Sequence, residues 1–178
     1  TTVTLGFSPR ARRYRPYDIK KAEKIFEKLG RSGEELIDSY LSTKMTSGEI
    51  ENFTWFNRDG ESGLPYDFSI QEAGNITYID VKTTSSTFNQ PIVFSLQELN
   101  FIANTPNKYC VYRIYNCNDA IKKLKICGNY QSYALKILKS ILQLDKNISP
   151  MGAKLQTLKI ISNLTYEDFI LGEDIDLV

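Results

Sequence analysis

Two aspartates and a lysine in the middle of the chain have the residue types and the spacing of a metal-dependent hydrolytic site. Twelve residues separate Asp67 from Asp80, and Lys82 lies two positions further on. If this segment is a strand, Asp80 and Lys82 share one face, because alternate residues of a strand point the same way. Two converging carboxylates repel each other unless a cation lies between them. We therefore expect Asp67 and Asp80 to bind a divalent ion.

The expected ion is Mg²⁺ or Mn²⁺. Mg²⁺ prefers one or two carboxylates, with phosphate and water oxygens as its other ligands. The carbonyl of Val81 lies between the two charged side chains in sequence and is a candidate third ligand. Lys82 is a compact cation suited to holding or deprotonating a water molecule and to stabilising a transferring phosphoryl group. Each residue alone could be an ordinary surface charge, but charges on a central strand need a reason.

Glu34 is the fourth candidate for the site. The segment 36–41 carries an apolar stripe at helical spacing, and Glu34 lies at the border of this stripe. Glu35 projects nearly opposite and is spaced to close a capping box with Ser32. We assign Glu34 to the site and Glu35 to the helix cap.

Periodicity and turn residues predict the elements that position these side chains. We expect helices over residues 17–29, 32–44, 95–103, 132–144 and 152–161, and strands over residues 50–56, 66–71, 76–83, 92–94 and 108–115. Gly30 is expected to end the first helix. The strands that carry Asp67 and Asp80 should form a hairpin, because a tight turn at Ala73-Gly74-Asn75 joins them.

Two further charged residues have local interpretations. Ser95 and Glu98 are spaced as a capping box, which makes Glu98 a structural rather than a catalytic residue. Arg113 alternates with apolar residues on the last predicted strand. It could reach a phosphate or a buried carboxylate, and the sequence does not choose between them.

The order α, β, β, β, α, β predicts an α/β (α+β) fold with a central mixed sheet flanked by helices. We divide the chain into a basic N-terminal extension with a helix (1–31), a core (32–118) and a mostly helical C-terminal extension (119–178). The net charge is +6 over residues 1–33, −8 over 34–80 and +3 over 81–178. Basic ends around an acidic middle suit a metal site beside a phosphate-binding surface, although ordinary solvated charge is equally compatible. The candidate nucleic-acid contacts are Arg10, Arg12, Arg13 and Arg15.

The composition excludes several classes of chemistry. The chain has no histidine and three cysteines without a CxxC pair, which disfavours a zinc site and removes any mechanism with a histidine base. The cysteines are expected to be thiols in a reducing cytoplasm. A mean hydropathy of −0.31 and the lack of an apolar run of 18 residues predict a soluble protein without a membrane partner. Whether the chain is part of a larger protein or forms a homo-oligomer stays open.

These features resemble the PD-(D/E)XK nuclease superfamily and, more closely, the NO VEIN C-terminal-type domain. The matching segments are Gly33-Glu34-Glu35, Tyr66-Asp67-Phe68, residues 78–84 (YIDVKTT), Phe94-Ser95 with Glu98-Leu99, and residues 112–116 (YRIYN). Together they cover roughly residues 30–118. The NO VEIN-type motif more often has Glu at the position of Asp80, and the wider superfamily accepts either acid.

The resemblance implies a restriction-endonuclease-like αβββαβ core and a metal-dependent endonuclease with DNA as the expected substrate. Such an enzyme leaves 5′-phosphate and 3′-hydroxyl ends, and related domains serve restriction and anti-phage defence. One alternative is a catalytically inactive nucleic-acid-binding or assembly module with the same fold. A weaker alternative is a metal-dependent phosphoesterase that acts on a nucleotide or small molecule. Intact carboxylates favour the first interpretation, because clustered negative charge does not help a module that only binds phosphates.

Overall fold

The computed structural model describes residues 16–177, and the side chains of residues 21–177. Its helices are α1 (Pro16–Thr46), α2 (Leu96–Asn104), α3 (Gln131–Ile148) and the short 3₁₀ helix η1 (Ser149–Met151). Its strands are β1 (Asn52–Trp55), β2 (Phe68–Glu72), β3 (Asn75–Thr83), β4 (Ile92–Ser95), β5 (Lys108–Tyr115), β6 (Lys122–Gly128), β7 (Lys159–Ser162) and β8 (Ile170–Leu177). The expected mixed α/β architecture is confirmed.

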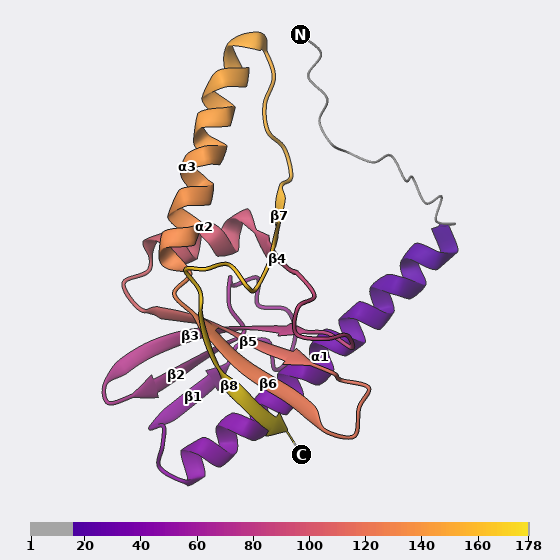
Figure 1. Ribbon diagram of the computed structural model, residues 1–178, viewed down its shortest axis with the longest axis vertical. Coiled ribbons are helices and arrows are strands. Elements are labelled where there is room, and N and C mark those ends of the chain that lie inside the picture. The colour runs from indigo at the N-terminus through magenta and orange to yellow at the C-terminus, as the bar shows by residue number, and fades with distance from the viewer. Residues whose placement is uncertain (1–15, 178) are drawn as a thin grey trace.

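The central sheet has six strands in the order β1-β2-β3-β5-β6-β8 (Figure 1). Strands β3 and β5 are parallel and every other neighbouring pair is antiparallel, so the sheet is mixed as expected. The parallel pair needs a crossover, which β4 and α2 provide. Strand β4 pairs instead with β7 in a separate two-stranded sheet.

Helices cover both faces of the sheet. On one face, Ile37 and Leu41 of α1 pack in a buried cluster with Ile79 of β3. On the other face, Leu99 of α2 belongs to a second cluster, against which Tyr78 packs. Figure 1 shows α3 projecting beyond the sheet with β7 beside it. Because side chains alternate along a strand, Asp80 points to the α2 side of the sheet, as Tyr78 does.

The predicted hairpin between the two site-bearing strands is confirmed. Residues Phe68 to Glu72 pair with Ile79 to Asn75. The two connecting residues, Ala73 and Gly74, have φ values of 48° and 76°. Positive φ at both central positions gives the turn the twist that its flanking strands need.

The predicted helix break at Gly30 is wrong, and so is the capping box of Ser32 with Glu35. Helix α1 runs without interruption through both positions and through the predicted boundary at residue 31. Arg31 stabilises this stretch, because its guanidinium donates to the carbonyls of Asn57 and Arg58, each at 2.8 Å. Glu35 forms an ion pair with Arg31 at 3.4 Å instead of capping a helix.

The C-terminal extension is not mostly helical, which corrects the prediction. The helix predicted over residues 132–144 is confirmed within α3, whereas no helix spans 152–161. Residues 159–162 form β7, in which Ile160 lies opposite Phe94 of β4. Strands β6 and β8 extend the central sheet. The apolar spacing of 152–161 is compatible with a helix. The partner strand β4 is far away in the sequence, so no local pattern reveals its pairing with β7.

Candidate active site

Asp67 directly precedes β2. It lies beside the part of β3 that extends beyond its pairing with β2. The pairing of β2 with β3 ends at Phe68 opposite Ile79, whereas β3 stays paired with β5 up to Thr83. Beyond the last β2 pair, the Val81 N–H donates to Asp67 Oδ2 at 2.7 Å. The Asp67 carboxylate thus accepts the hydrogen bond that a neighbouring strand would have accepted. This hydrogen bond holds Asp67 against β3, beside Asp80.

Asn57 holds the second oxygen of Asp67. Its Nδ2 donates to Asp67 Oδ1 at 2.7 Å, and its own Oδ1 accepts the Ser62 N–H at 3.0 Å. Asn57 is buried. In the sequence it is one residue of a turn-rich stretch, and no local signal marks it as a partner of Asp67.

Lys82 lies between two carboxylates. Its Nζ is 2.8 Å from Asp80 Oδ2 and 2.7 Å from Glu98 Oε1. The contact with Asp80 is ionic but lacks hydrogen-bond alignment, so the buried Oδ2 of Asp80 has no hydrogen bond among the described residues. As expected, Asp80 and Lys82 project from the same face of β3 and meet at one place.

Glu98 does more than the predicted capping. The capping box is confirmed, because Ser95 Oγ accepts the Glu98 N–H while the Glu98 carboxylate accepts the Ser95 N–H. The remaining carboxylate oxygen contacts Lys82. The same residue therefore fixes the start of α2 and the lysine of the site.

The electrostatics of the three central groups follow from burial and proximity. Burial raises the pKa of Asp67 to about 6 and the pKa of Asp80 to about 7. Repulsion from Asp67 and Glu98 adds to the rise at Asp80, and Lys82 opposes it. Burial alone would lower the pKa of Lys82, but Asp80 and Glu98 raise it above its ordinary value. Lys82 therefore keeps its positive charge. The buried carboxylates beside it would be costly to ionise without a positive charge nearby.

Glu34 reaches the same cavity from α1. This cavity has a volume of about 310 Å³, and its charged lining residues are Glu34, Glu61, Asp67, Asp80, Lys82 and Glu98. The Trp55 indole N–H donates to Glu34 Oε2 at 2.8 Å. Burial raises the pKa of Glu34, although the Trp55 hydrogen bond opposes the rise. Glu34 thus faces the cavity as expected, held by Trp55, whereas the ion pairs of Lys82 are with Asp80 and Glu98.

Arg113 takes neither of the two roles left open for it. Its side chain is buried and donates to two carbonyls, that of Gln90 at 2.8 Å and that of Lys82 at 3.3 Å. It therefore stabilises the backbone at Lys82 and Gln90. Arg10, Arg12, Arg13 and Arg15 lie outside the described residues.

The donor set suits a hard divalent cation. Five carboxylates share the cavity with one ammonium, and Val81 also lines it. Over residues 16–177, no three Asp, Glu, Cys or His side chains are arranged as a ready set of metal ligands. In this arrangement the Lys82 ammonium supplies the positive charge between the carboxylates. The buried Asp80 Oδ2 lies 2.8 Å from this ammonium, although it has no aligned hydrogen bond among the described residues. By chemistry, the residues fit Mg²⁺ or Mn²⁺.

Two further expectations concern cysteines and membranes. Cys110, Cys117 and Cys127 are free thiols. Among the helices of residues 16–177, none has the length and hydropathy that crossing a bilayer requires.

Comparison with known proteins identifies relatives for the central segment. Residues 33–126 match the family described as Protein NO VEIN, C-terminal. The chain is similar to two proteins of Arabidopsis thaliana over 89 residues each, with 32% identity to Protein NO VEIN-LIKE and 30% to Protein NO VEIN. The match covers 49% of this chain, but only 13% and 3% of those relatives. No solved structure matches. Glu34, Asp67, Asp80 and Lys82 lie within the matched range.

Proposed function

This chain belongs to the NO VEIN C-terminal family, and we propose that it is a metal-dependent endonuclease of the PD-(D/E)XK type. The proposed restriction-endonuclease-like core consists of α1, β1 to β3, α2 and β5. The observation that carries the proposal is the meeting of Asp67, Asp80 and Lys82 in one carboxylate-lined cavity. The expected substrate is DNA. A cytoplasmic setting in restriction or anti-phage defence is proposed from the resemblance alone.

Asp67, Asp80 and the Val81 carbonyl are the groups that would hold Mg²⁺ or Mn²⁺. Such an ion polarises a phosphoryl oxygen and lowers the pKa of water. The cost of ionising both buried aspartates supports this assignment, because a divalent cation relieves their repulsion. Proton release on metal binding follows from their raised pKa values.

Lys82 is proposed to act as a charged hydrogen-bond donor. Because its two carboxylate partners raise its pKa, it keeps its proton and stabilises negative charge that develops on the phosphoryl group. Glu34 is proposed to orient water on the α1 side of the cavity. In the overall reaction, the water oxygen bonds to phosphorus, the bond from phosphorus to the 3′-oxygen breaks, and a proton goes to that oxygen. The products are 5′-phosphate and 3′-hydroxyl ends.

A cleavage assay tests this proposal. Supercoiled plasmid, single-stranded DNA and RNA are incubated with the protein in Mg²⁺, Mn²⁺ or EDTA. We expect cleavage in Mg²⁺ or Mn²⁺ and none in EDTA, with ends that a ligase accepts without further treatment. Binding without cleavage in either metal would favour the inactive nucleic-acid-binding module. Cleavage of a nucleotide phosphoester alone would favour the small-molecule phosphoesterase.

A further inference from the structure

We call the site cavity lined by Glu34, Asp67, Asp80, Lys82 and Glu98 the carboxylate cavity. A second cavity, of about 490 Å³, adjoins it and has no charged side chain in its lining. We call it the amide cavity. Its lining includes the aromatic residues Tyr78 and Phe101 and the amide residues Gln97, Asn100, Asn104 and Asn107. Pro65 and Gln97 also line the carboxylate cavity, so the two cavities are direct neighbours. A ligand that spans both would meet strong charge in one and neutral groups in the other.

Strand β3 links the two cavities. Tyr78 precedes Asp80 by two residues and shares its face, which places the two side chains about 7 Å apart along the strand. Tyr78 lines the amide cavity and Asp80 lines the carboxylate cavity. This separation is similar to that between a phosphate and the base of the same nucleotide.

Aromatic rings form the wall between the cavities. Tyr66 lines the carboxylate cavity, and its ring centroid is 4.4 Å from that of Tyr78. Phe101 lies edge-on to Tyr78 at 5.0 Å and completes the apolar surface of the amide cavity. Aromatic side chains of this kind contact the faces of nucleobases whatever the base sequence.

The polar part of the amide cavity comes mainly from one side of α2. Gln97, Asn100 and Asn104 are spaced three and four residues apart, so they lie on neighbouring turns of the same helix face. The Asn104 Nδ2 donates to the Asn100 carbonyl at 2.7 Å, which restrains this row of amides. Each amide side chain offers both a donor and an acceptor, as the edges of nucleobases do.

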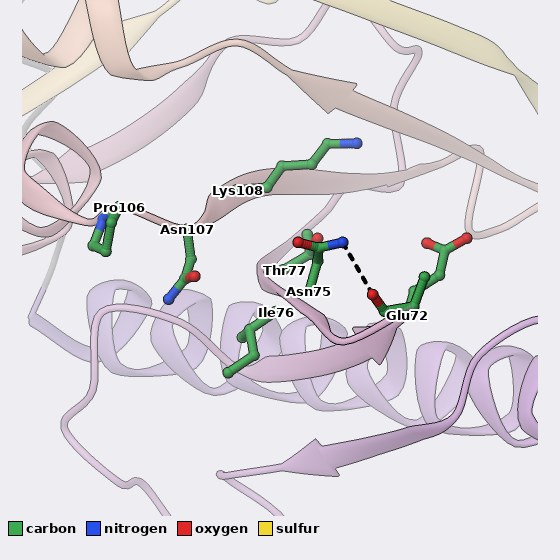
Figure 2. A pocket seen from close by; sticks show the side chains of 8 residues that line it. Glu72, Asn75, Ile76, Thr77, Pro106, Asn107 and Lys108 are labelled. Carbon is green, nitrogen blue, oxygen red and sulfur yellow. Dashed lines mark hydrogen bonds between the residues drawn. The ribbon is translucent and has the colours of Figure 1, made fainter.

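Beyond Asn107, charged side chains line the surface again. Pro106 and Asn107 also line a neighbouring cavity, whose charged side chains are Glu72 and Lys108. Figure 2 shows Asn107 and Lys108 at the start of β5 beside Asn75 and Thr77 at the start of β3. Lys108 is exposed and could contact the phosphate of a second nucleotide. The carboxylate cavity with its proposed metal ion, the amide cavity and Lys108 thus follow one another along the surface. This order would suit a phosphate, a base and a second phosphate.

We propose that the amide cavity receives an unpaired nucleobase next to the phosphodiester held at the carboxylate cavity. The inference rests on the proposed nuclease function and names its substrate class as single-stranded or locally unpaired nucleic acid. A phosphate gains little from an uncharged lining, whereas a base is neutral and has both a stacking face and a hydrogen-bonding edge. A base in a duplex must first leave its stack to enter such a pocket, which disfavours paired substrates.

The test measures fluorescence anisotropy of labelled oligonucleotides, with Ca²⁺ in place of Mg²⁺ to slow cleavage. The probes are one single-stranded DNA sequence, the same sequence as RNA, its DNA duplex, and a DNA series in which one abasic position moves along the strand. We expect the single strand to bind at least about tenfold more tightly than the duplex. One abasic position, adjoining the bond cut in Mg²⁺, should weaken binding by roughly 5- to 100-fold. Comparison of the DNA and RNA strands identifies which polymer supplies the base.

The double variant Asn100→Ala with Asn104→Ala separates base recognition from general binding. Both side chains are exposed, so the fold should tolerate their loss. We expect about tenfold weaker binding of the intact strand and unchanged binding of the strand that is abasic at the sensitive position. Asn118→Ala, at an exposed position between β5 and β6, is the matched control and should change neither.

Two results would overturn the inference for different reasons. If wild type cuts nucleic acid but tolerates every abasic position and binds the duplex equally well, the amide cavity holds no base and the nuclease proposal stands. If wild type neither binds nor cuts any probe, the nuclease proposal falls together with the base pocket.

Discussion

The Lys82 ammonium lies 2.7 Å from Glu98 Oε1, which joins the start of α2 to the centre of the sheet. Glu98 also closes the capping box with Ser95. Glu98 therefore contacts both the start of helix α2 and the lysine of the site, which Asp80 contacts as well. Movement of α2 would change the position of Lys82, and the reverse also holds.

Substitution Glu98→Gln tests this link. Glutamine still serves a capping box, so the fold should be kept, whereas the ion pair with Lys82 is lost. Changes to groups that orient a metal site typically cost 10- to 100-fold in activity, and we expect a loss of cleavage rate in that range. The control Glu35→Gln, at an exposed position of α1, should leave the rate unchanged. Equal rates for both variants and wild type would remove Glu98 from the site.

Substitution Gly33→Ala should destabilise the fold where α1 crosses β3. An added Cβ would lie 1.9 Å from Thr83 Oγ1 and 2.9 Å from Thr83 Cβ, so the helix would have to move. Overpacking of this kind costs about 1–3 kcal/mol. Gly30→Ala in the same helix is the control, because its Cβ would meet nothing within 4 Å. Replacing a glycine within a helix by alanine stabilises by roughly 0.5–1 kcal/mol where the added methyl group has room. Thermal unfolding should show shifts of opposite sign, and a gain for both would contradict the close approach.

The metal-free protein should lose stability as the pH rises from about 4 to about 8. Asp67 and Asp80 have higher pKa values in the folded chain, about 6 and 7, than in the unfolded chain. Their protonation therefore stabilises the fold at low pH, and this contribution is lost as the pH passes through those values. Asp80→Asn should raise the Tm at pH 8 by several degrees, since about 1 kcal/mol corresponds to roughly 2–4 °C. Tm values in EDTA across this range test both statements. A wild-type Tm that rises steadily with pH would contradict them.

The basic N-terminal segment should contribute to nucleic-acid binding. Its arginines lie outside the described residues, so this prediction depends on the charge pattern alone. Replacing Arg12, Arg13 and Arg15 by Ala should weaken binding and reduce the salt dependence, by roughly one unit of slope for each lost phosphate contact. Binding titrations over a salt series measure the slope. An unchanged affinity and slope would remove this segment from the interface.

Local signals were sufficient for the centre of the site. Alternation predicted the shared face of Asp80 and Lys82, and the turn at Ala73-Gly74 predicted the hairpin that brings Asp67 close. The partners of these residues could not be predicted. Glu98 already had a local explanation in its capping box, and no pattern indicated that α2 begins beside Lys82. Asn57 likewise looked like an ordinary turn residue.

The errors in the fold have a common physical cause in long-range packing. Gly30 is typical of a helix end, but the Arg31 contacts with the 57–58 carbonyls and the fit of Gly33 against Thr83 keep α1 continuous. Strand β8 contains three acidic residues and pairs with β6. There the Lys123 and Lys125 side chains pair with Asp176 and Asp174. Pairing of this kind depends on a partner strand, so a short window of sequence does not show it.

The most direct test of the central claim compares the rate of nucleic-acid cleavage in Mg²⁺ for wild type, Asp80→Asn and Lys82→Ala, alongside calorimetric titration of each protein with Mn²⁺. Asp80→Asn should abolish both metal binding and cleavage, because a neutral amide is a poor ligand for these ions. Lys82→Ala should still bind Mn²⁺, since a positive charge is removed, yet lose about two to four orders of magnitude in rate. If both variants cut nucleic acid as fast as wild type, the activity lies elsewhere and the assignment of this site is wrong.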